Sequence, residues 1–221
     1  MSAIVTFIGW HDSGKTTLIS EVVAELKEMG YRVAVIKSSS SNGVMFDSHG
    51  TDTQRYKEVG ADSVLFVAPD QMVLQTGSTD LSLRTLAHRY FPDVDIVIGE
   101  GFKSARKIAK IEVSRNPEQM LRNEVHGVIA VATDIEDIVG DYIFRLDESR
   151  EIAQFIEKRF LVGKSVRFEQ TALLINGNKV PIKDFVQEAL AGTVHGFVAS
   201  LKFVDDIEEL ELRIKLPKKD T

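Results

Sequence analysis

The chain contains no cysteine among its 221 residues. This absence excludes disulfides, thiolate zinc sites, iron–sulfur ligation and cysteine nucleophiles. The chain also has no excess of positive charge, because 27 Lys and Arg against 33 Asp and Glu give a formal net charge of -6. A protein of this charge has no overall cationic field to attract nucleic acid or an anionic membrane. An anionic ligand therefore has to be held by a local site.

Long apolar runs are missing as well. No stretch approaches the roughly 18 uninterrupted apolar residues of a membrane-spanning helix, and Met1–Val5 lacks the cationic flank and apolar core of a signal peptide. We therefore expect a cytoplasmic protein with no membrane or nucleic-acid partner. Hydrophobic residues make up 43% of the chain and the mean hydropathy is -0.05. These values are typical of a globular chain, long enough here for one domain of about 150 residues and a smaller one.

Short apolar runs alternate with helix-period segments over the first 160 residues. Residues 3–8 and 32–36 predict buried strands, and residues 14–29 between them carry apolar side chains at helical spacing. Further helices are expected at 53–59, 81–89 and 149–159, a hairpin at 63–67 and 72–75, and further strands at 95–98, 108–113, 127–132 and 142–145. This alternation predicts an α/β fold with a mostly parallel sheet and helices on both faces.

The residues from 161 to 221 follow a different pattern. An Asn-Gly pair at Asn176 and Gly177 lies between two short apolar runs and predicts a hairpin turn. A helix is expected after Pro181, and two strands are expected at 197–204 and 208–216. The sequence thus predicts a first domain over residues 1–160 and a small α+β extension over residues 161–221, whose role the sequence leaves open.

A phosphate-binding motif follows the first predicted strand. Gly9-Trp10-His11-Asp12-Ser13-Gly14-Lys15-Thr16 satisfies G-x-x-x-x-G-K-[ST] between a strand and a helix, the context that the motif requires. Its glycines let backbone N–H groups turn toward an anion, and the helix N-terminus adds partial positive charge. Lys15 offers a cation to the outer phosphates, and the Thr16 hydroxyl can bind Mg²⁺. These residues predict a P-loop NTPase.

Bound Mg²⁺ needs further oxygen ligands, which carboxylates can supply. Glu100 stands where an apolar strand ends, and the carboxyl ends of parallel strands face the ligand crevice. We therefore expect Glu100 to lie on the metal side and Asp95, at the other end of the strand, to lie farther away. Asp52, in the polar segment 38–52, is a second metal candidate. Asp52 is equally suited to cap the helix that begins at Thr53.

Several short segments carry a resemblance to a known family. They are Gly9–Thr17, Val35-Ile36-Lys37, Gly50-Thr51-Asp52-Thr53 with Gly60-Ala61, Glu100-Gly101-Phe102-Lys103, Lys110-Ile111-Glu112-Val113 with Arg115, and Ala130-Val131-Ala132-Thr133-Asp134. Together they resemble the molybdopterin-guanine dinucleotide biosynthesis protein B (MobB) family over roughly residues 1–160. Glu-Gly-Phe-Lys followed by Lys-Ile-Glu-Val at this spacing is much more specific than the P-loop, which many NTPases share.

The resemblance implies a homodimeric protein that binds GTP with Mg²⁺, hydrolyses it weakly and acts mainly as an adaptor. Its implied partner is the MobA-like nucleotidyltransferase that joins GMP to molybdopterin, with molybdopterin or a molybdoenzyme as further partners. Carried onto this chain, the nucleotide-binding residues are Gly9, His11, Asp12, Ser13, Gly14, Lys15, Thr16, Thr17, Lys103 and Asp134. The implied metal ligands are Thr16, Asp52 and Glu100, and the implied catalytic residues are Lys15, Asp52 and Glu100.

Two features of the second half of the first domain leave alternatives open. Asp134 follows the strand at 127–132, where its carboxylate could accept hydrogen bonds from guanine N1–H and N2–H₂, a donor pair that adenine lacks. It could equally cap a helix over 135–139. The main cationic group comprises Lys103, Lys107, Lys110 and Arg115. It is either a solvated face or an anionic pocket for the phosphate of a pterin.

The chain departs from the family pattern after Lys37. Ser38–Ser41 and Asn42 stand where family members usually have histidines, and His49 could replace these only in part. Two other function classes stay open. One is a small-molecule kinase in which Asp47 or Asp52 serves as base. The other is a metal-insertion chaperone GTPase, against which the lack of cysteine and of a histidine cluster argues.

Overall fold

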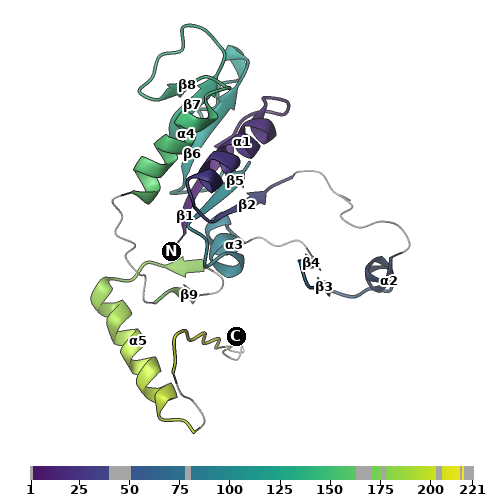
Figure 1. Ribbon diagram of the computed structural model, residues 1–221, viewed down its shortest axis with the longest axis vertical. Helices are drawn as coiled ribbons and strands as arrows, with labels where there is room; N and C mark the ends of the chain where they lie inside the picture. The colour runs from purple at the N-terminus through teal and green to yellow at the C-terminus, as the bar shows by residue number, and fades with distance from the viewer. Residues whose placement is uncertain are drawn as a thin grey trace, which may run out of the picture. The chain divides into compact units, whose positions relative to one another are not determined.

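The computed structural model describes residues 2–39, 51–77, 81–162, 171–175, 178–202, 206–214 and 216, and Figure 1 shows its helices and strands. Contacts between residues divide the chain into two units, residues 1–165 and residues 166–221. The first unit carries the P-loop, and the second carries the C-terminal hairpin and helix. No helix in the described part of the chain combines the length and the apolar character needed to cross a membrane.

A six-stranded sheet forms the centre of the first unit. Its order is β2-β5-β1-β6-β7-β8, and every neighbouring pair in it is parallel. The strands are β1 (Ala3–Ile8), β2 (Val33–Lys37), β5 (Ile96–Glu100), β6 (Ala109–Ser114), β7 (Val128–Thr133) and β8 (Ile143–Phe144). Because β1 lies between β5 and β6, the loop after β1 lies beside the ends of both. This arrangement confirms the predicted mostly parallel sheet.

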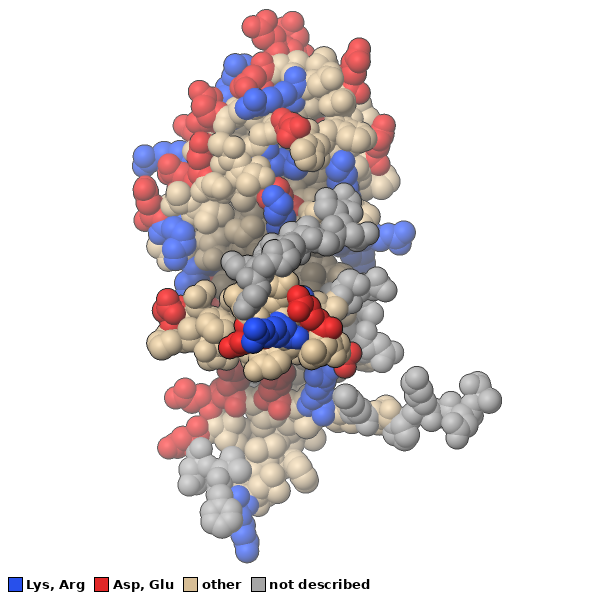
Figure 2. Space-filling view, turned by 90° about the vertical axis from the view of Figure 1, so that its right-hand side faces the viewer, with Lys and Arg blue, Asp and Glu red and all other residues tan. Residues whose placement is uncertain are grey.

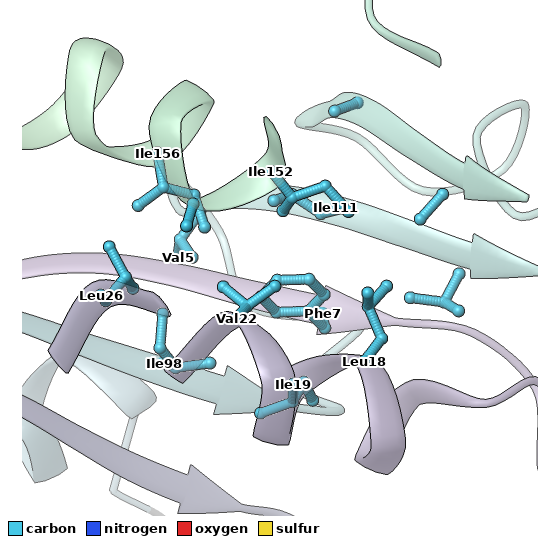
Figure 3. Packing of buried hydrophobic residues seen from close by; sticks show 14 of the residues in the cluster. Val5, Phe7, Leu18, Ile19, Val22, Leu26, Ile98, Ile111, Ile152 and Ile156 are labelled. Atoms are coloured by element: carbon cyan, nitrogen blue, oxygen red, sulfur yellow. The ribbon is translucent and has the colours of Figure 1, made fainter. Parts of the chain in front are cut away.

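Two helices cover one face of the sheet. They are α1 (Lys15–Glu28) and α4 (Ser149–Ile156), and a π-helical turn over Glu157–Leu161 continues α4. Figure 3 shows Leu18, Val22 and Leu26 of α1 and Ile152 and Ile156 of α4 gathered around Val5 and Phe7 of β1. All seven side chains are buried. Removing them from water supplies the main driving force for this packing.

The opposite face of the sheet is covered by α3 (Leu83–Tyr90), whose N-cap Ser82 accepts a hydrogen bond from Thr85 N. Side chains alternate between the two faces of a strand, so Thr6 points away from Val5 and Phe7. A Cβ on Gly99 would lie 2.7 Å from Thr6 Oγ1 and 2.9 Å from Leu83 Cδ2. Gly99 therefore lets α3 pack closely against β5, and the prediction of helices on both faces is confirmed.

A separate antiparallel hairpin consists of β3 (Ser63–Val67) and β4 (Met72–Thr76), as predicted. It follows α2 (Asp52–Glu58), and residues of both its strands line a pocket together with α2. The N-cap of α2 is Thr51, whose side chain accepts a hydrogen bond from Gln54 N at 3.3 Å. The alternative that Asp52 caps this helix is therefore wrong by one residue, because Asp52 is already helical.

The second unit contains β9 (Leu173–Ile175) paired antiparallel with β10 (Asn178–Val180), followed by α5 (Asp184–Ala199). The predicted hairpin is confirmed, although its turn residues lie outside the described part of the chain. The strand predicted at 197–204 is wrong at its start, because α5 continues to Ala199. The strand predicted at 208–216 is absent from the described residues 208–214. Short apolar runs do not distinguish a strand from a helix, and a strand also needs a partner.

Candidate nucleotide-binding site

The P-loop joins β1 to α1, and close packing requires one of its glycines while backbone conformation favours the other. A Cβ on Gly9 would lie 2.2 Å from the carbonyl oxygen of Val113 in β6, so no side chain fits there. Gly14 is the N-cap of α1 and has a φ of 90°, in the left-handed region that glycine adopts without strain. Thr16 and Thr17 lie in the first turn of α1, where free backbone N–H groups favour an anion.

Lys15 folds back over the loop to which it belongs. Its ammonium donates to the carbonyl oxygen of Trp10 and to Ser13 Oγ, the latter at 3.2 Å. Burial lowers the pKa of Lys15 below its ordinary value, and the nearby ammonium groups of Lys103 and Lys37 lower it further. The carboxylate of Glu100 acts in the opposite direction. Several cations thus converge on one loop, which favours a ligand with several negative charges.

The beginning of the loop is more exposed. His11 Nδ1 lies 2.8 Å from Asp12 Oδ2, and both side chains are almost fully exposed. Trp10 is 47% exposed, and the Lys103 ammonium lies 4.2 Å from the centroid of its ring. This cation–π contact brings the loop after β5 to the P-loop, as the predicted ligand role of Lys103 requires.

Glu100 and Thr16 lie side by side, as predicted for a metal site. Thr16 Oγ1 donates to Glu100 Oε1 at 2.8 Å. Glu100 is the last residue of β5, and its side chain is only 11% exposed. The hydroxyl of the buried Thr6 lies 3.0 Å from the carbonyl oxygen of Gly99 and 2.9 Å from that of Gly101, which fixes the backbone on both sides of Glu100.

A hydroxyl and a carboxylate in contact are ligands that suit Mg²⁺, which commonly takes few protein oxygens and completes its shell with phosphate and water. No group of three or more His, Asp or Glu side chains suited to a metal ion occurs in the described part of the chain. The donor set of Thr16 and Glu100 therefore fits a metal that binds together with a nucleotide.

Asp52 is not brought to this pair by any described contact. Its carboxylate lies on the first turn of α2, is 85% exposed and is 3.8 Å from Arg55 Nη1. The alternative base Asp47, as well as His49 and the residues 40–42, lies outside the described part of the chain. At the other end of β5, Asp95 accepts a hydrogen bond from Arg32 N at 2.7 Å. Asp95 is thus remote from the P-loop end of the sheet, as expected.

Asp134 lies beyond the end of β7, on the opposite side of β1 from Glu100. Its Oδ1 is 3.7 Å from Arg145 Nη2 and accepts a hydrogen bond from Leu146 N at 3.4 Å. No helix follows over 135–139, where the chain turns, so the alternative that Asp134 caps a helix is wrong. On the same side, Arg115 lies against the P-loop, since a Cβ on Gly14 would lie 3.3 Å from Arg115 Nη2.

Three of the four residues of the predicted cationic group line one pocket, whereas Arg115 lies against the P-loop. Lys110 is buried, and its ammonium donates to the carbonyl oxygens of Ala105, Ile108 and His126 at 2.6, 3.2 and 3.0 Å. Burial lowers the pKa of Lys110. Because backbone oxygens use its donors, Lys110 fastens the loop before β6 and is not free for a ligand. The pocket that Lys110 lines together with Lys103, Arg106 and Lys107 does not include Arg115.

Charges of both signs are interspersed on the face shown in Figure 2, with no continuous cationic area. The sequence analysis did not predict two charged residues as functional groups, the exposed Lys37 and the buried Glu112. Lys37 at the end of β2 lies 3.0 Å from Glu100 Oε1. Glu112 in β6 is fully buried and accepts hydrogen bonds from Leu121 N and from Arg122 N, the latter at 2.8 Å. Both residues belong to segments that resemble the family. A charged residue within or at the end of an apolar strand is the sequence feature that could have indicated their roles.

A parallel sheet with a P-loop after its central strand, and a strand-end carboxylate beside the threonine of that loop, defines a P-loop NTPase fold. The family model for molybdopterin guanine dinucleotide synthesis protein B (MobB) matches residues 4–134. The chain belongs to the MobB family, which confirms the resemblance of its segments.

Known relatives agree with this assignment. A Haemophilus influenzae molybdopterin-guanine dinucleotide biosynthesis adapter protein is 33% identical, and the match covers 67% of this chain and 84% of that protein. A Methanocaldococcus jannaschii protein, provisionally given the same name, is 26% identical over 97% of this chain and 98% of its own length. That match extends over both units.

Solved structures support the fold. A crystal structure of MobB has 32% sequence identity and a TM-score of 0.59, with 70% of this chain and 98% of that chain covered. Bacillus subtilis MobB has 22% identity and a TM-score of 0.59, with 72% of this chain and 98% of that chain covered. The α/β P-loop fold predicted from the sequence is therefore confirmed.

Proposed function

We propose that this protein is a GTP-binding adapter in molybdenum cofactor biosynthesis, which assists the attachment of GMP to molybdopterin and hydrolyses GTP only weakly. The observation that carries this proposal is the P-loop with Thr16 and Glu100 in contact, in a chain whose relatives are named adapter proteins of molybdopterin-guanine dinucleotide biosynthesis. Its partner is then a nucleotidyltransferase of that pathway.

The loop would bind the phosphates in three ways. Backbone N–H groups at the start of α1 point toward an anion, Lys15 adds a cation, and Lys103 lies close enough to lower the pKa of Lys15. Thr16 and Glu100 would hold Mg²⁺, which neutralises the charge that develops on the outer phosphates. Asp52, on the first turn of α2, is proposed as a further metal ligand, although no described contact brings it to Thr16 and Glu100.

Guanine selection would use the opposite side of β1. The nucleotide would extend from Glu100 across the P-loop toward the ends of β6 and β7, because these strands lie on the other side of β1. Asp134 follows β7 there, and both Arg145 and Leu146 N contact the same oxygen of its carboxylate, Oδ1. We propose that the second oxygen accepts hydrogen bonds from the guanine edge.

A homodimer formed through the β3–β4 hairpin is part of the proposal. Leu65 lies opposite Leu74 and Val67 opposite Met72, and these four side chains are 44 to 69% exposed. They share one face of the hairpin, because successive side chains of a strand alternate between its two faces. A two-stranded hairpin with such a face is marginally stable alone and gains stability from a partner.

The second unit is proposed to be a separate domain that begins near residue 161 and supports docking or dimer formation. It offers α5, whose Phe185 and Phe197 are 67 and 69% exposed. The pocket lined by Lys103, Arg106 and Lys107 supports molybdopterin as a further ligand, because its cationic side chains suit an anionic pterin phosphate.

The adapter role is tested with the purified full-length protein immobilised and offered the purified nucleotidyltransferase. Retention of this partner is measured with a non-hydrolysable GTP analogue, with GDP and without nucleotide. We expect retention to differ severalfold between nucleotide states in the natural protein and to be the same in all three states with Lys15→Ala. Equal retention in every state by the natural protein would contradict a nucleotide-controlled adapter.

A further inference from the structure

The ammonium of Lys37 lies at the pair of oxygens that would hold a metal. Its Nζ is 3.0 Å from Glu100 Oε1 and 3.5 Å from Thr16 Oγ1. The same Glu100 oxygen accepts the Thr16 hydroxyl at 2.8 Å. A cation of the protein itself therefore contacts both predicted metal ligands.

The sheet explains why Lys37 lies there. Lys37 ends β2, Glu100 ends β5, and the two residues are direct neighbours in the parallel register of these strands. Ser38 N donates to the carbonyl oxygen of Glu100 at 2.9 Å and extends this pairing by one residue. A nearly buried carboxylate is costly without a countercharge, and Lys37 supplies one.

The side chains of Glu100 and Lys37 differ in how tightly they are held. The Glu100 side chain is 11% exposed and is also held by Thr16, whereas the Lys37 side chain is 58% exposed. A lysine stem has four rotatable carbons, so its ammonium can leave for solvent while the carboxylate stays in place. Mg²⁺ binds carboxylate oxygens at about 2.1 Å and is repelled by an adjacent ammonium. Metal and Lys37 therefore exclude one another at Glu100.

We propose that Lys37 is a built-in counter-ion of Glu100 that takes the place of the divalent cation when metal is absent and is displaced when metal binds. The inference rests on the proposed nucleotide site. This role of Lys37 predicts that the protein retains affinity for the nucleotide without Mg²⁺, because the ammonium of Lys37 compensates the negative charge of Glu100 near the phosphates. The dependence of nucleotide affinity on Mg²⁺ is reduced for the same reason.

The experiment measures the Kd of a non-hydrolysable GTP analogue by calorimetry in EDTA and in excess Mg²⁺. Lys37→Met removes the ammonium, which exposes the phosphates to the Glu100 charge in EDTA and frees Glu100 for Mg²⁺. Both effects raise the ratio of the Kd in EDTA to the Kd in Mg²⁺, by about fivefold for a half-exposed ion pair. Lys27→Met makes the same charge change in the last turn of α1 and should leave the ratio unchanged.

A double-mutant cycle assigns the effect to Glu100. In the Glu100→Gln background, Lys37→Met should change the ratio less than twofold, because no carboxylate remains to be compensated. Lys37→Gln removes the charge but keeps a hydrogen-bond donor near Glu100. It should change the ratio as Lys37→Met does, which would show that the effect comes from the lost charge and not from altered packing. Thermal unfolding of each variant checks that the fold is retained.

Other outcomes overturn the inference. If Lys37→Met weakens binding by the same factor in EDTA and in Mg²⁺, Lys37 is a simple phosphate ligand. If the ratio falls, Lys37 positions Glu100 for the metal and does not replace the metal. Absence of nucleotide binding by the natural protein contradicts the proposed function as well, whereas binding with an unchanged ratio contradicts only the role of Lys37.

Discussion

Two charged residues inside β6 are stabilised by backbone groups. Lys110 donates to three carbonyl oxygens of the segments before β6 and before β7, and Glu112 accepts from two backbone N–H groups of the turn near Leu121. Both side chains are buried, so these hydrogen bonds replace the water that each charge has lost. The two residues fasten the loops on either side of β6 to the sheet.

Replacement of Lys110 by methionine should destabilise the protein. Three carbonyl oxygens would lose a donor in a buried place, and the expected loss is about 3 kcal/mol of the free energy of unfolding. Urea denaturation measures this loss. Lys107→Met, an exposed lysine in the same loop, is the matched control and should change the free energy of unfolding by less than about 0.5 kcal/mol. A loss no larger than that of the control would contradict the structural role of Lys110.

The stabilising effect of Lys110 should also depend on pH. Burial lowers its pKa from the ordinary value of 10.5, so the unfolded chain binds more protons than the folded one between the two pKa values. The free energy of unfolding of the natural protein, relative to Lys110→Met, should therefore rise as the pH approaches 10.5 from below. Parallel urea denaturation series at rising pH test this sign. A relative stability that falls over this range would show that the three carbonyls raise the pKa instead.

At the scale of elements, the β3–β4 hairpin carries the proposed dimer contact. Leu74→Asp places a charge in the centre of the exposed apolar face, and a charge buried in such an interface is costly. Sedimentation velocity should give twice the 24.6 kDa of one chain for the natural protein and a single chain for Leu74→Asp. Leu74→Met keeps an apolar side chain and should remain dimeric. A monomeric natural protein, or a dimeric Leu74→Asp variant, would rule out this interface.

The sequence predicted most elements because their periodicity is local. The buried strand over residues 3–8 and the helix that follows the P-loop were found within a residue or two. The segments after α5 were not, because a short apolar run acquires its conformation from a partner that the sequence does not identify. The sequence also did not predict the order of the strands in the sheet. Lys37 is a neighbour of Glu100 only because β2 pairs with β5 in that order.

At the scale of the whole molecule, an acidic chain holds a local cationic site. The formal net charge is -6, yet Lys15, Lys37 and Lys103 lie close enough that the latter two lower the pKa of the first. The sequence predicted Lys15, Thr16 and Glu100 as one site, and the structure brings the last two into contact. The sequence could not predict that Lys110 turns inward, because that depends on how the loops before β6 and β7 place the carbonyl oxygens of Ala105, Ile108 and His126.

The central claim is that the P-loop binds GTP with Mg²⁺, and the single tryptophan offers a direct measurement. Trp10 lies in the loop with Lys103 over its ring, so a bound nucleotide should change its fluorescence. Titration with GTP and Mg²⁺ should give a saturable change that ATP produces only at higher concentration. Lys15→Ala should weaken binding about a hundredfold, as expected for the loss of charge-assisted hydrogen bonds, and Lys27→Ala should leave it unchanged. No saturable change with the natural protein, confirmed by calorimetry, or equal binding by Lys15→Ala would contradict the account.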